Sequence, residues 1–325
     1  TLHDVAARAG VSVATASRYL AGIKVSNKNA DAVRKAADAL GYVPNIAARA
    51  LKSDRTLTVG VVFDQLSGPL GTELLDALAS GLDEHGYCVF LATAQSTEER
   101  FDALAQRFLE RRVDALMCVN AIGEGKALAR YESLGIPVIA LFGKSGGYEK
   151  LPTIAPVIAG AVREACERLI ALGHETIGVV RPARRSRPIE GFRTGAKRAG
   201  LTVRSFDLPE GPFDPVGLLN TLMNETQRPT AIIAPQSEAT QIFEAADALS
   251  IIVPRMLSII AIRDRTLQMP TTRLPLSMIH LNPAKVGVVA AELVVEALLE
   301  GTAIKGDRSV EMGSWIERGT TAAPS

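Results

Sequence analysis

The sequence contains few aromatic residues and few cysteines, and these shortages narrow the class of protein. Aromatic residues make up 5% of the 325 residues, while hydrophobic residues make up 47% and charged residues 22%. This composition excludes a disordered or fibrous chain and indicates an aliphatic-rich, soluble α/β protein. The three cysteines, Cys88, Cys118 and Cys166, lie far apart in apolar contexts without metal or redox spacing. We therefore expect buried free thiols in a reducing compartment.

Signals of secretion, membrane insertion and catalysis are also missing. The sequence shows no secretion signal and no apolar run of membrane-spanning length, which predicts a cytoplasmic protein. It shows no phosphate-cradling glycine loop, no acid and base pair at useful spacing and no metal cluster, so we expect no enzymatic activity and no cofactor. His174 and His280 have no nucleophile or metal partner in the sequence, which favours structural or cleft-rim roles for both.

The near-neutral net charge of +1 conceals an uneven distribution. Residues 1–56 contain nine basic and four acidic residues, a net charge of +5, so the rest of the chain carries −4. A basic N-terminal part on a mildly acidic remainder is what phosphate binding at one end requires. At 325 residues the chain is long enough for two or three domains.

Residues 1–44 are predicted to form three short helices around a small core. Thr1 and Asp4 match a capping box at the start of the first helix, Ser12 can cap the second, and Ser26 can cap the third. The third helix then presents an apolar stripe formed by Ala30, Val33, Ala37 and Leu40. Three such helices make a helix-turn-helix module.

The second helix carries the residues that favour DNA binding. Within 11–20, Ala16 and Leu20 fall on one face, and the other face presents Ala14, Ser17 and Arg18. A small, hydroxylated and cationic face fits the major groove of DNA, where arginine can bridge guanine O6 and N7. Taken by itself, the segment could equally be an alanine-rich surface helix.

Residues 45–52 form a second segment of interest, because a short helical pattern follows a proline-broken turn. Leu51 stands between Arg49 and Lys52 on a helix too short to be stable alone. An apolar residue between cations suits a wedge pressed into a minor groove beside phosphate contacts. The alternative is an ordinary interdomain linker.

The basic N-terminal part, residues 1–56, resembles the LacI/GalR family of bacterial repressors. The similarity lies in the segments 1–20, 41–45 and 48–56, and the pair Val13 and Ala14 followed by Arg18 is similar to the galactose-repressor subgroup. The resemblance implies that the second helix enters the major groove and that residues 45–52 form a hinge helix that orders on operator DNA. It implies DNA contacts at Ser12, Val13, Ala14, Thr15, Ser17, Arg18, Asn45, Ala48, Arg49, Leu51 and Lys52.

Residues 57–325 alternate between strand and helix patterns, which predicts parallel, doubly wound sheets. The expected strands are 58–63, 86–92, 115–119, 137–142, 176–180, 201–206, 231–234, 257–262 and one near Val310. The expected helices are 72–85, 98–111, 126–134, 160–172, 189–199, 215–223, 239–249 and 284–299. Together with the looser family resemblance of this part, the pattern predicts a periplasmic-binding-protein-like core of two half-domains. We expect a helix-turn-helix domain at 1–44, a hinge at 45–56, half-domain one at about 57–153 plus 283–307, and half-domain two at about 154–282 plus 308–325.

A ligand of such a core would bind in a cleft at the carboxyl ends of the strands. The candidate effector residues are Asp64, Gln65, Thr72, Arg187, Gln236, Ser237, Arg263 and Asp264. The sequence departs from the family pattern at 156–157, 236–237 and 261–264, where carboxylates and amides that grip sugar hydroxyls are largely replaced. Arginines instead gather near the cleft-forming turns, at Arg181, Arg184, Arg185, Arg187 and Arg263.

Three interpretations of this cleft remain open. Guanidinium groups match carboxylate or phosphate geometry, which favours a sugar acid or sugar phosphate as effector. A neutral sugar or nucleoside is the second possibility. The third is that the arginines are solvated loop charges and no effector is needed.

These features predict a DNA-binding transcriptional regulator, with repression as the expected mode of action. We expect it to bind a palindromic operator as a homodimer and to be controlled by a small-molecule effector. The alternative is a solute-binding protein of the same core fold, although it would have no use for a basic head. A doubly wound enzyme is a third class, and a fold by itself does not confer chemistry.

Overall fold

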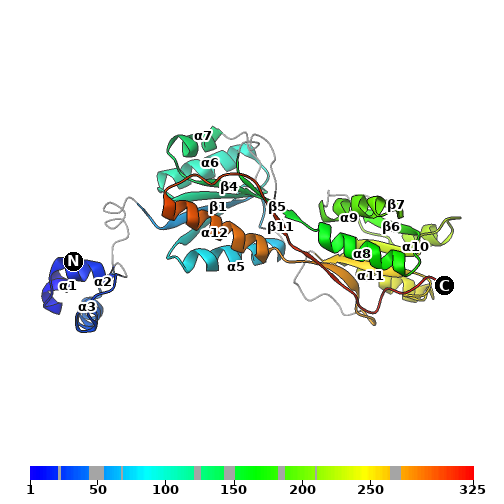
Figure 1. Ribbon diagram of the computed structural model, residues 1–325, viewed down its shortest axis with the longest axis horizontal. Coiled ribbons are helices and arrows are strands. Elements are labelled where there is room, and N and C mark those ends of the chain that lie inside the picture. Colours follow the sequence, from blue (N-terminus) through cyan, green and yellow to red (C-terminus); the bar gives the residue numbers. More distant parts are fainter. Residues whose placement is uncertain are drawn as a thin grey trace. The chain divides into compact units, whose positions relative to one another are not determined.

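The computed structural model describes the chain outside residues 21–22, 44–54, 67–68, 121–125, 143–150, 182–186, 209–210 and 264–271. The described chain forms two compact units, Thr1–Leu57 and Thr58–Ser325, which we call the head and the body. Figure 1 shows the elements of each unit.

The head contains three helices, α1 (Leu2–Ala9), α2 (Val13–Leu20) and α3 (Asn27–Ala39). The predicted capping box is present. The Asp4 amide donates a hydrogen bond to the Thr1 side chain, and the Asp4 carboxylate accepts one from the N-terminal amine of Thr1. Gly10 ends α1 with a left-handed φ of 65°, which glycine adopts without steric cost. The predicted three-helix head is therefore confirmed.

A small apolar core holds these helices together. It consists of Val5, Ala6, Ala16, Val33, Ala36 and Ala37. The prediction that Leu40 belongs to this core is wrong, because its side chain is 41% exposed. Leu40 is the C-cap of α3, where the chain leaves the helical path, and Ala36 occupies the core in its place.

Half-domain one of the body is a parallel six-stranded sheet in the order β11-β5-β4-β3-β1-β2. Its strands are β1 (Thr58–Phe63), β2 (Cys88–Thr93), β3 (Ala115–Val119), β4 (Val138–Leu141), β5 (Thr153–Val157) and β11 (Arg308–Glu311). Its helices are α5 (Pro69–Asp83), α6 (Glu98–Glu110), α7 (Lys126–Ser133) and α12 (Ala284–Glu300). Helices α6 and α7 lie over one face of the sheet, and α5 and α12 lie over the other (Figure 1).

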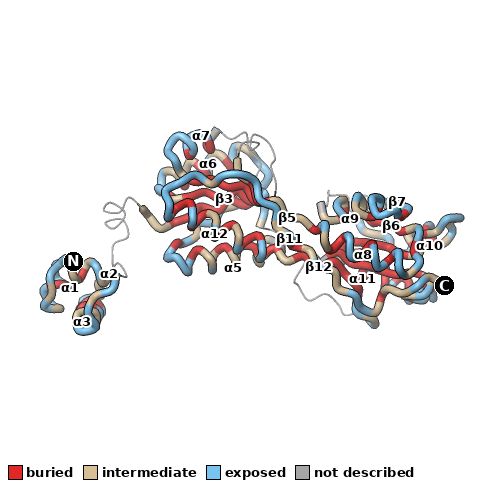
Figure 2. Tube along the Cα trace, in the orientation of Figure 1, coloured by how far each residue is buried: buried red, intermediate tan, exposed pale blue. Residues whose placement is uncertain are grey.

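Half-domain two repeats this architecture with the strand order β12-β10-β9-β8-β6-β7. Its strands are β6 (Thr176–Arg181), β7 (Thr202–Asp207), β8 (Ala231–Pro235), β9 (Ser258–Arg263), β10 (Ser277–Leu281) and β12 (Gly313–Ile316). Its helices are α8 (Ala159–Ala171), α9 (Arg187–Arg198), α10 (Pro215–Met223) and α11 (Gln236–Ala248). The buried residues concentrate on the central strands of both sheets, as Figure 2 shows.

The predicted alternation of strands and helices is confirmed, but three strands were not expected and two half-domain boundaries differ from expectation. The pattern did not predict β5, β10 or β12, which are four or five residues long, and β12 pairs antiparallel with β10. Because β5 and β11 both belong to the first sheet, two crossings between the half-domains lie near residues 158 and 312 rather than at 154 and 308, whereas the third lies near residue 282, as expected.

The cysteines only partly follow the prediction. Cys118 and Cys166 are buried free thiols, and burial raises the pKa of Cys166 to about 11. Cys88 is exposed, because it begins β2 at the open edge of the first sheet. Among the described helices, none combines the length and the apolar character needed to cross a membrane.

Candidate DNA-binding and effector sites

The start of α2 is fixed by local hydrogen bonds. The Thr15 amide donates to Ser12 Oγ at 3.1 Å, and the Ser12 and Thr15 hydroxyls are 2.9 Å apart. Ser12 thus caps α2 as predicted, since its oxygen satisfies an amide that has no partner within the helix. This cap sets the position at which the next side chains leave the helix.

The outward face of α2 is small and carries one guanidinium group. Ala16 is fully buried against the head core, which turns the opposite side of the helix to solvent. Val13, Ala14 and Arg18 are exposed there, and Ser17 is half-buried. Because short side chains allow the helix to approach base edges closely, this face suits major-groove binding.

The remaining predicted DNA contacts lie outside the described residues. These are Asn45, Ala48, Arg49, Leu51 and Lys52. Their roles stay predictions.

At the carboxyl edge of the first sheet, Asp64 and Gln65 follow β1 and meet the turn after β2. The Asp64 carboxylate accepts hydrogen bonds from the Ser96 amide at 2.6 Å and from the Ser96 hydroxyl at 3.1 Å. Gln65 Nε2 donates to Ser96 Oγ at 3.2 Å. These contacts hold Gln95 and Ser96 in left-handed conformations, with φ of 54° and 60°.

Ser96 is therefore a residue of this edge that the sequence pattern missed. Left-handed conformations are costly for residues other than glycine, and they concentrate at ligand-binding edges of folds. Asn120 after β3 and Phe142 after β4 adopt positive φ at the same edge. No sequence signal marks these positions, because the long-range contacts that hold them are not local.

The predicted residues of half-domain two end or begin elements at the corresponding edge of the second sheet. Gln236 and Ser237 begin α11 directly after β8, and the Ser237 hydroxyl donates to Glu238. Within the described part of the chain, the buried Gln236 Oε1 accepts no hydrogen bond. Arg187 begins α9 and Arg263 ends β9, but their side chains, like the whole of Asp264, lie outside the description.

Arg181, at the end of β6, is already neutralised by two carboxylates. Its Nε lies 2.9 Å from Glu190 Oε1, and its Nη1 lies 3.0 Å from Asp207 Oδ1. Arg193 also binds Glu190, at 2.9 Å. Burial raises the pKa of Glu190, but the hydrogen bonds and charges of Arg193 and Arg181 outweigh it, so the pKa is lowered overall. Arg181 therefore supports an ion-pair network rather than a free anion site.

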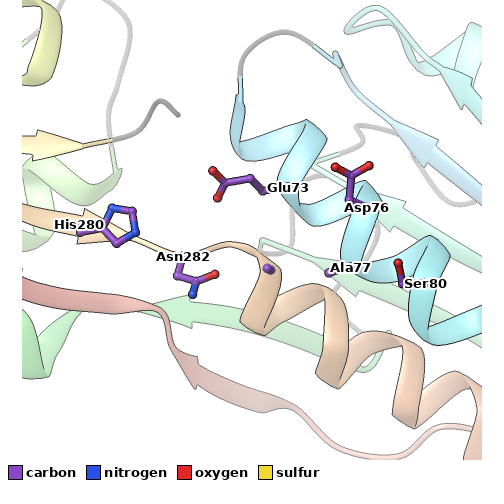
Figure 3. Close-up of a pocket in the computed structure, with 7 residues that line it drawn as sticks. Glu73, Asp76, Ala77, Ser80, His280 and Asn282 are labelled. Atoms are coloured by element: carbon purple, nitrogen blue, oxygen red, sulfur yellow. The ribbon is translucent and has the colours of Figure 1, made fainter. Parts of the chain in front are cut away.

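A pocket of about 450 Å³ lies between α5 and the crossing that leads into α12. It is lined by Glu73, Asp76, Ala77, Ser80, His280, Asn282 and Ala284. In Figure 3, Glu73 extends toward the side occupied by His280, while Asp76 and Ser80 follow along the same helix. For His280 a structural or cleft-rim role was expected. The other lining residues were not predicted, because they come from elements about 200 positions apart.

His174 has a structural role, as expected. It is 2% exposed, its Nδ1 lies 2.8 Å from the Thr230 hydroxyl, and its Nε2 lies 3.0 Å from the Ala322 carbonyl oxygen. These contacts identify the tautomer that carries its proton on Nε2, since a carbonyl can only accept. His174 thereby ties the C-terminal segment to the second sheet.

Comparison with known proteins identifies the domains of the chain. Residues 1–45 match the model of bacterial regulatory proteins of the lacI family, and residues 166–321 match the periplasmic binding protein-like domain. The chain joins a LacI-family DNA-binding domain to a periplasmic-binding-protein-like domain. The protein is therefore a DNA-binding transcriptional regulator, and the solute-binding alternative is not favoured.

Curated relatives of the protein match nearly its whole length. It is 26% identical to catabolite control protein A of Priestia megaterium, over 93% of each chain. It is 27% identical to the repressor PurR of Actinobacillus pleuropneumoniae serotype 5b, over 92% of this chain and 91% of the relative. It is 26% identical to the ribose operon repressor of Escherichia coli K12, over 93% and 94%. These relatives are transcriptional regulators and not enzymes.

Solved structures agree with the fold of the chain. The Lac repressor bound to ONPG in the repressed state is 25% identical, covers 99% of both chains and has a TM-score of 0.75. The Lac repressor dimer bound to operator and the anti-inducer ONPF is 24% identical over 99% of both chains, with a TM-score of 0.77. The predicted fold class, a helix-turn-helix head on a core of two doubly wound half-domains, is confirmed.

Proposed function

We propose that this regulator represses transcription by binding a palindromic operator as a homodimer, with α2 in the major groove. The observation that carries this proposal is the exposed face of Val13, Ala14 and Arg18 on a helix whose start is set by the Ser12 cap. Arg18 reads a guanine, and Val13 and Ala14 select the neighbouring bases by their size. Two heads are needed because a two-fold operator presents two half-sites.

Residues 45–52 act in this proposal as a hinge helix. Leu51 wedges the minor groove at the operator centre, and Asn45, Ala48, Arg49 and Lys52 contact the adjacent backbone. The protein acts on DNA in the cytoplasm and catalyses no reaction.

A small hydroxylated effector between the half-domains controls DNA binding in this proposal. Supporting residues are Asp64, Gln65 and Thr72 on one side and Gln236 and Ser237 on the other, all near carboxyl ends of strands. The favoured effector is an anionic sugar derivative, whose charge is bound by Arg187 and Arg263 beside Asp264. Arg181 is not proposed to bind it, because two carboxylates already neutralise its guanidinium group. Effector binding changes the relative pose of the half-domains and so the cost of ordering residues 45–52 on DNA.

Selection of binding sites from a random duplex library tests the DNA role. The full-length protein should enrich a palindrome with two half-sites, and its affinity should fall steeply as salt rises because phosphate contacts release counterions. Enrichment of single half-sites would contradict the dimer, and salt-independent binding would contradict the phosphate contacts.

A further inference from the structure

The two half-domains are joined by three chain crossings that are hydrogen-bonded to one another. The Met312 amide donates to the Val157 carbonyl at 2.9 Å, and the Asn282 amide donates to the Met312 carbonyl at 2.8 Å. The crossing at Met312 therefore binds the other two. Any change in the relative pose of the half-domains must be absorbed at these three positions.

Glu311 stands directly before the central crossing and contacts the opposite half-domain. It ends β11 in the first sheet, in register with Val157 of β5. Its Oε2 accepts the Gly160 amide at 3.0 Å, in the first turn of α8, and its Oε1 accepts the Gly313 amide at 3.2 Å. One carboxylate of half-domain one thus holds the beginning of a helix of half-domain two.

The local sequence is adapted to this contact. Ile158, at the N-cap of α8, provides no side-chain hydrogen bond, so Glu311 supplies the cap from 151 positions away. A carboxylate at a helix N-terminus is favoured by the helix dipole. A Cβ added to Gly160 would lie 3.2 Å from Glu311 Oε2, and one added to Gly313 would lie 3.0 Å from the Cβ of Ile158. Both glycines therefore permit the close approach.

We infer that Glu311 is a positioning residue that latches the two half-domains in the observed pose, so that rotation at the crossings must first release the Gly160 amide. The latch biases the equilibrium between poses on which effector control depends; only this regulatory consequence rests on the proposed function. Arg168 and Glu317 make a contrasting contact at 2.7 Å, toward the other end of α8 but entirely within half-domain two.

Amide hydrogen exchange of the full-length protein tests the latch without operator or effector. In Glu311→Ala, the amides of Asn282 and Met312 should exchange about tenfold faster or more, as expected for losing hydrogen bonds to a charged group. Glu311→Gln, which keeps one acceptor oxygen, should be intermediate. The matched control Glu317→Gln removes a carboxylate that contacts the same helix through Arg168, and it should leave both crossing amides unchanged.

The pattern of exchange separates a latch from a local cap. Faster exchange confined to Gly160 and its neighbours in α8, with the crossing amides unchanged, would overturn the inference, as would no change at all. If Glu311→Ala does not fold, the comparison of Glu311→Gln with Glu317→Gln decides in the same way. Failure of the operator selection would leave this result standing, so the two proposals fail separately.

Interlobe distances give a second readout that a local cap would not alter. In a Cys88→Ser background, spin labels at Glu132→Cys and Asn220→Cys mark exposed sites on the two half-domains. Dilution with unlabelled chain suppresses distances between partners in a dimer. Adding Glu311→Ala should broaden the distance distribution, whereas adding Glu317→Gln should not. An unchanged distribution in Glu311→Ala would count against the latch.

Discussion

Neighbouring residues determine whether Arg18 is available to bind a ligand. The burial of Ala16 and the cap at Ser12 fix which way α2 faces, and Arg18 is exposed on that outward face. In contrast, Arg181 has the same chemistry but is held by Glu190 and Asp207. A guanidinium group is free to recognise a ligand only where the fold leaves it without carboxylate neighbours.

Arg18→Ala should weaken binding to the selected operator by about 1–3 kcal/mol and relax the preference at one base pair in each half-site. The loss arises because a bidentate contact to guanine disappears. Competition titrations with operators substituted at each position measure it. An equal loss on every duplex, including random sequence, would instead assign Arg18 to the phosphate backbone.

His174 makes the stability of half-domain two depend on pH. Burial lowers its pKa below the ordinary value of 6.5, although the bond to the Ala322 carbonyl acts in the opposite direction. The unfolded chain then binds the proton more readily than the native protein. The stability contributed by neutral His174 should be complete above pH 6.5 and should be lost as pH falls below it.

Denaturant unfolding between pH 8 and pH 5 checks this expectation. His174→Gln should destabilise the protein by about 1–3 kcal/mol at pH 8, because it disturbs two buried hydrogen bonds, and should unfold with a weaker pH dependence than the unmodified protein. His85→Gln, at an exposed histidine, is the matched control for the substitution and should change the free energy of unfolding at pH 8 by less than about 0.5 kcal/mol. Parallel pH profiles for His174→Gln and the unmodified protein would exclude His174 as the source.

At the scale of elements, α5 and α12 pack unusually closely because small residues face each other. A Cβ at Gly287 would lie 2.7 Å from the Leu74 carbonyl oxygen and 2.8 Å from the Ala77 Cβ. A Cβ at Gly81 would lie 2.8 Å from the Ala291 Cβ. The close pairing positions the first turn of α12, and with it Asn282, beside the crossings.

Gly287→Ala should therefore destabilise the body by about 1–3 kcal/mol, since backbone atoms must move apart to admit the methyl group. The exposed Val288→Ala on the same helix is the control and should change stability by less than about 0.5 kcal/mol. Chemical unfolding followed by circular dichroism measures both. Equal stabilities of the two variants would mean that the helices separate without cost.

At the scale of the whole molecule, charge is divided between a basic head and a mildly acidic body. Residues 1–56 carry +5 and the remainder −4, so attraction to DNA is concentrated at one end of the chain. In the proposed function the body contributes control instead of affinity, through a cleft whose predicted residues come from both half-domains. The two functions can then change independently during selection of new operators or effectors.

A thermal-shift panel of sugars, sugar acids and sugar phosphates identifies the effector class. A ligand at 100 times its dissociation constant adds about 2.7 kcal/mol to the free energy of unfolding. We expect an anionic sugar derivative to raise the melting temperature, with the shift reduced in Arg263→Ala. Stabilisation by neutral sugars alone would end the anionic hypothesis, and no shift by any compound would argue against a sugar-type effector.

Features of the fold that depend on local interactions could be predicted from the sequence, whereas those that depend on long-range interactions could not. The sequence by itself determined the capped helices of the head and most of the alternating elements of the body, because caps, proline breaks and apolar periodicity act over a few residues. It also carried the charge asymmetry and the family resemblance. The prediction for Leu40 was wrong because the apolar periodicity of the third helix was extended to its last position. Leu40 is the C-cap of α3, and its side chain is exposed.

Only the tertiary structure decided the contacts between distant segments. Ser96 forms a hydrogen bond with Asp64, and Arg181 forms ion pairs with Glu190 and Asp207. The Glu311 carboxylate accepts a hydrogen bond from the Gly160 amide. These pairs join separate elements, up to 151 positions apart, so their meeting depends on strand order and on where the chain crosses between sheets. Local sequence patterns do not encode the strand order. The first twenty residues therefore indicate a DNA-binding regulator, but only the tertiary structure shows which contacts hold its two half-domains together.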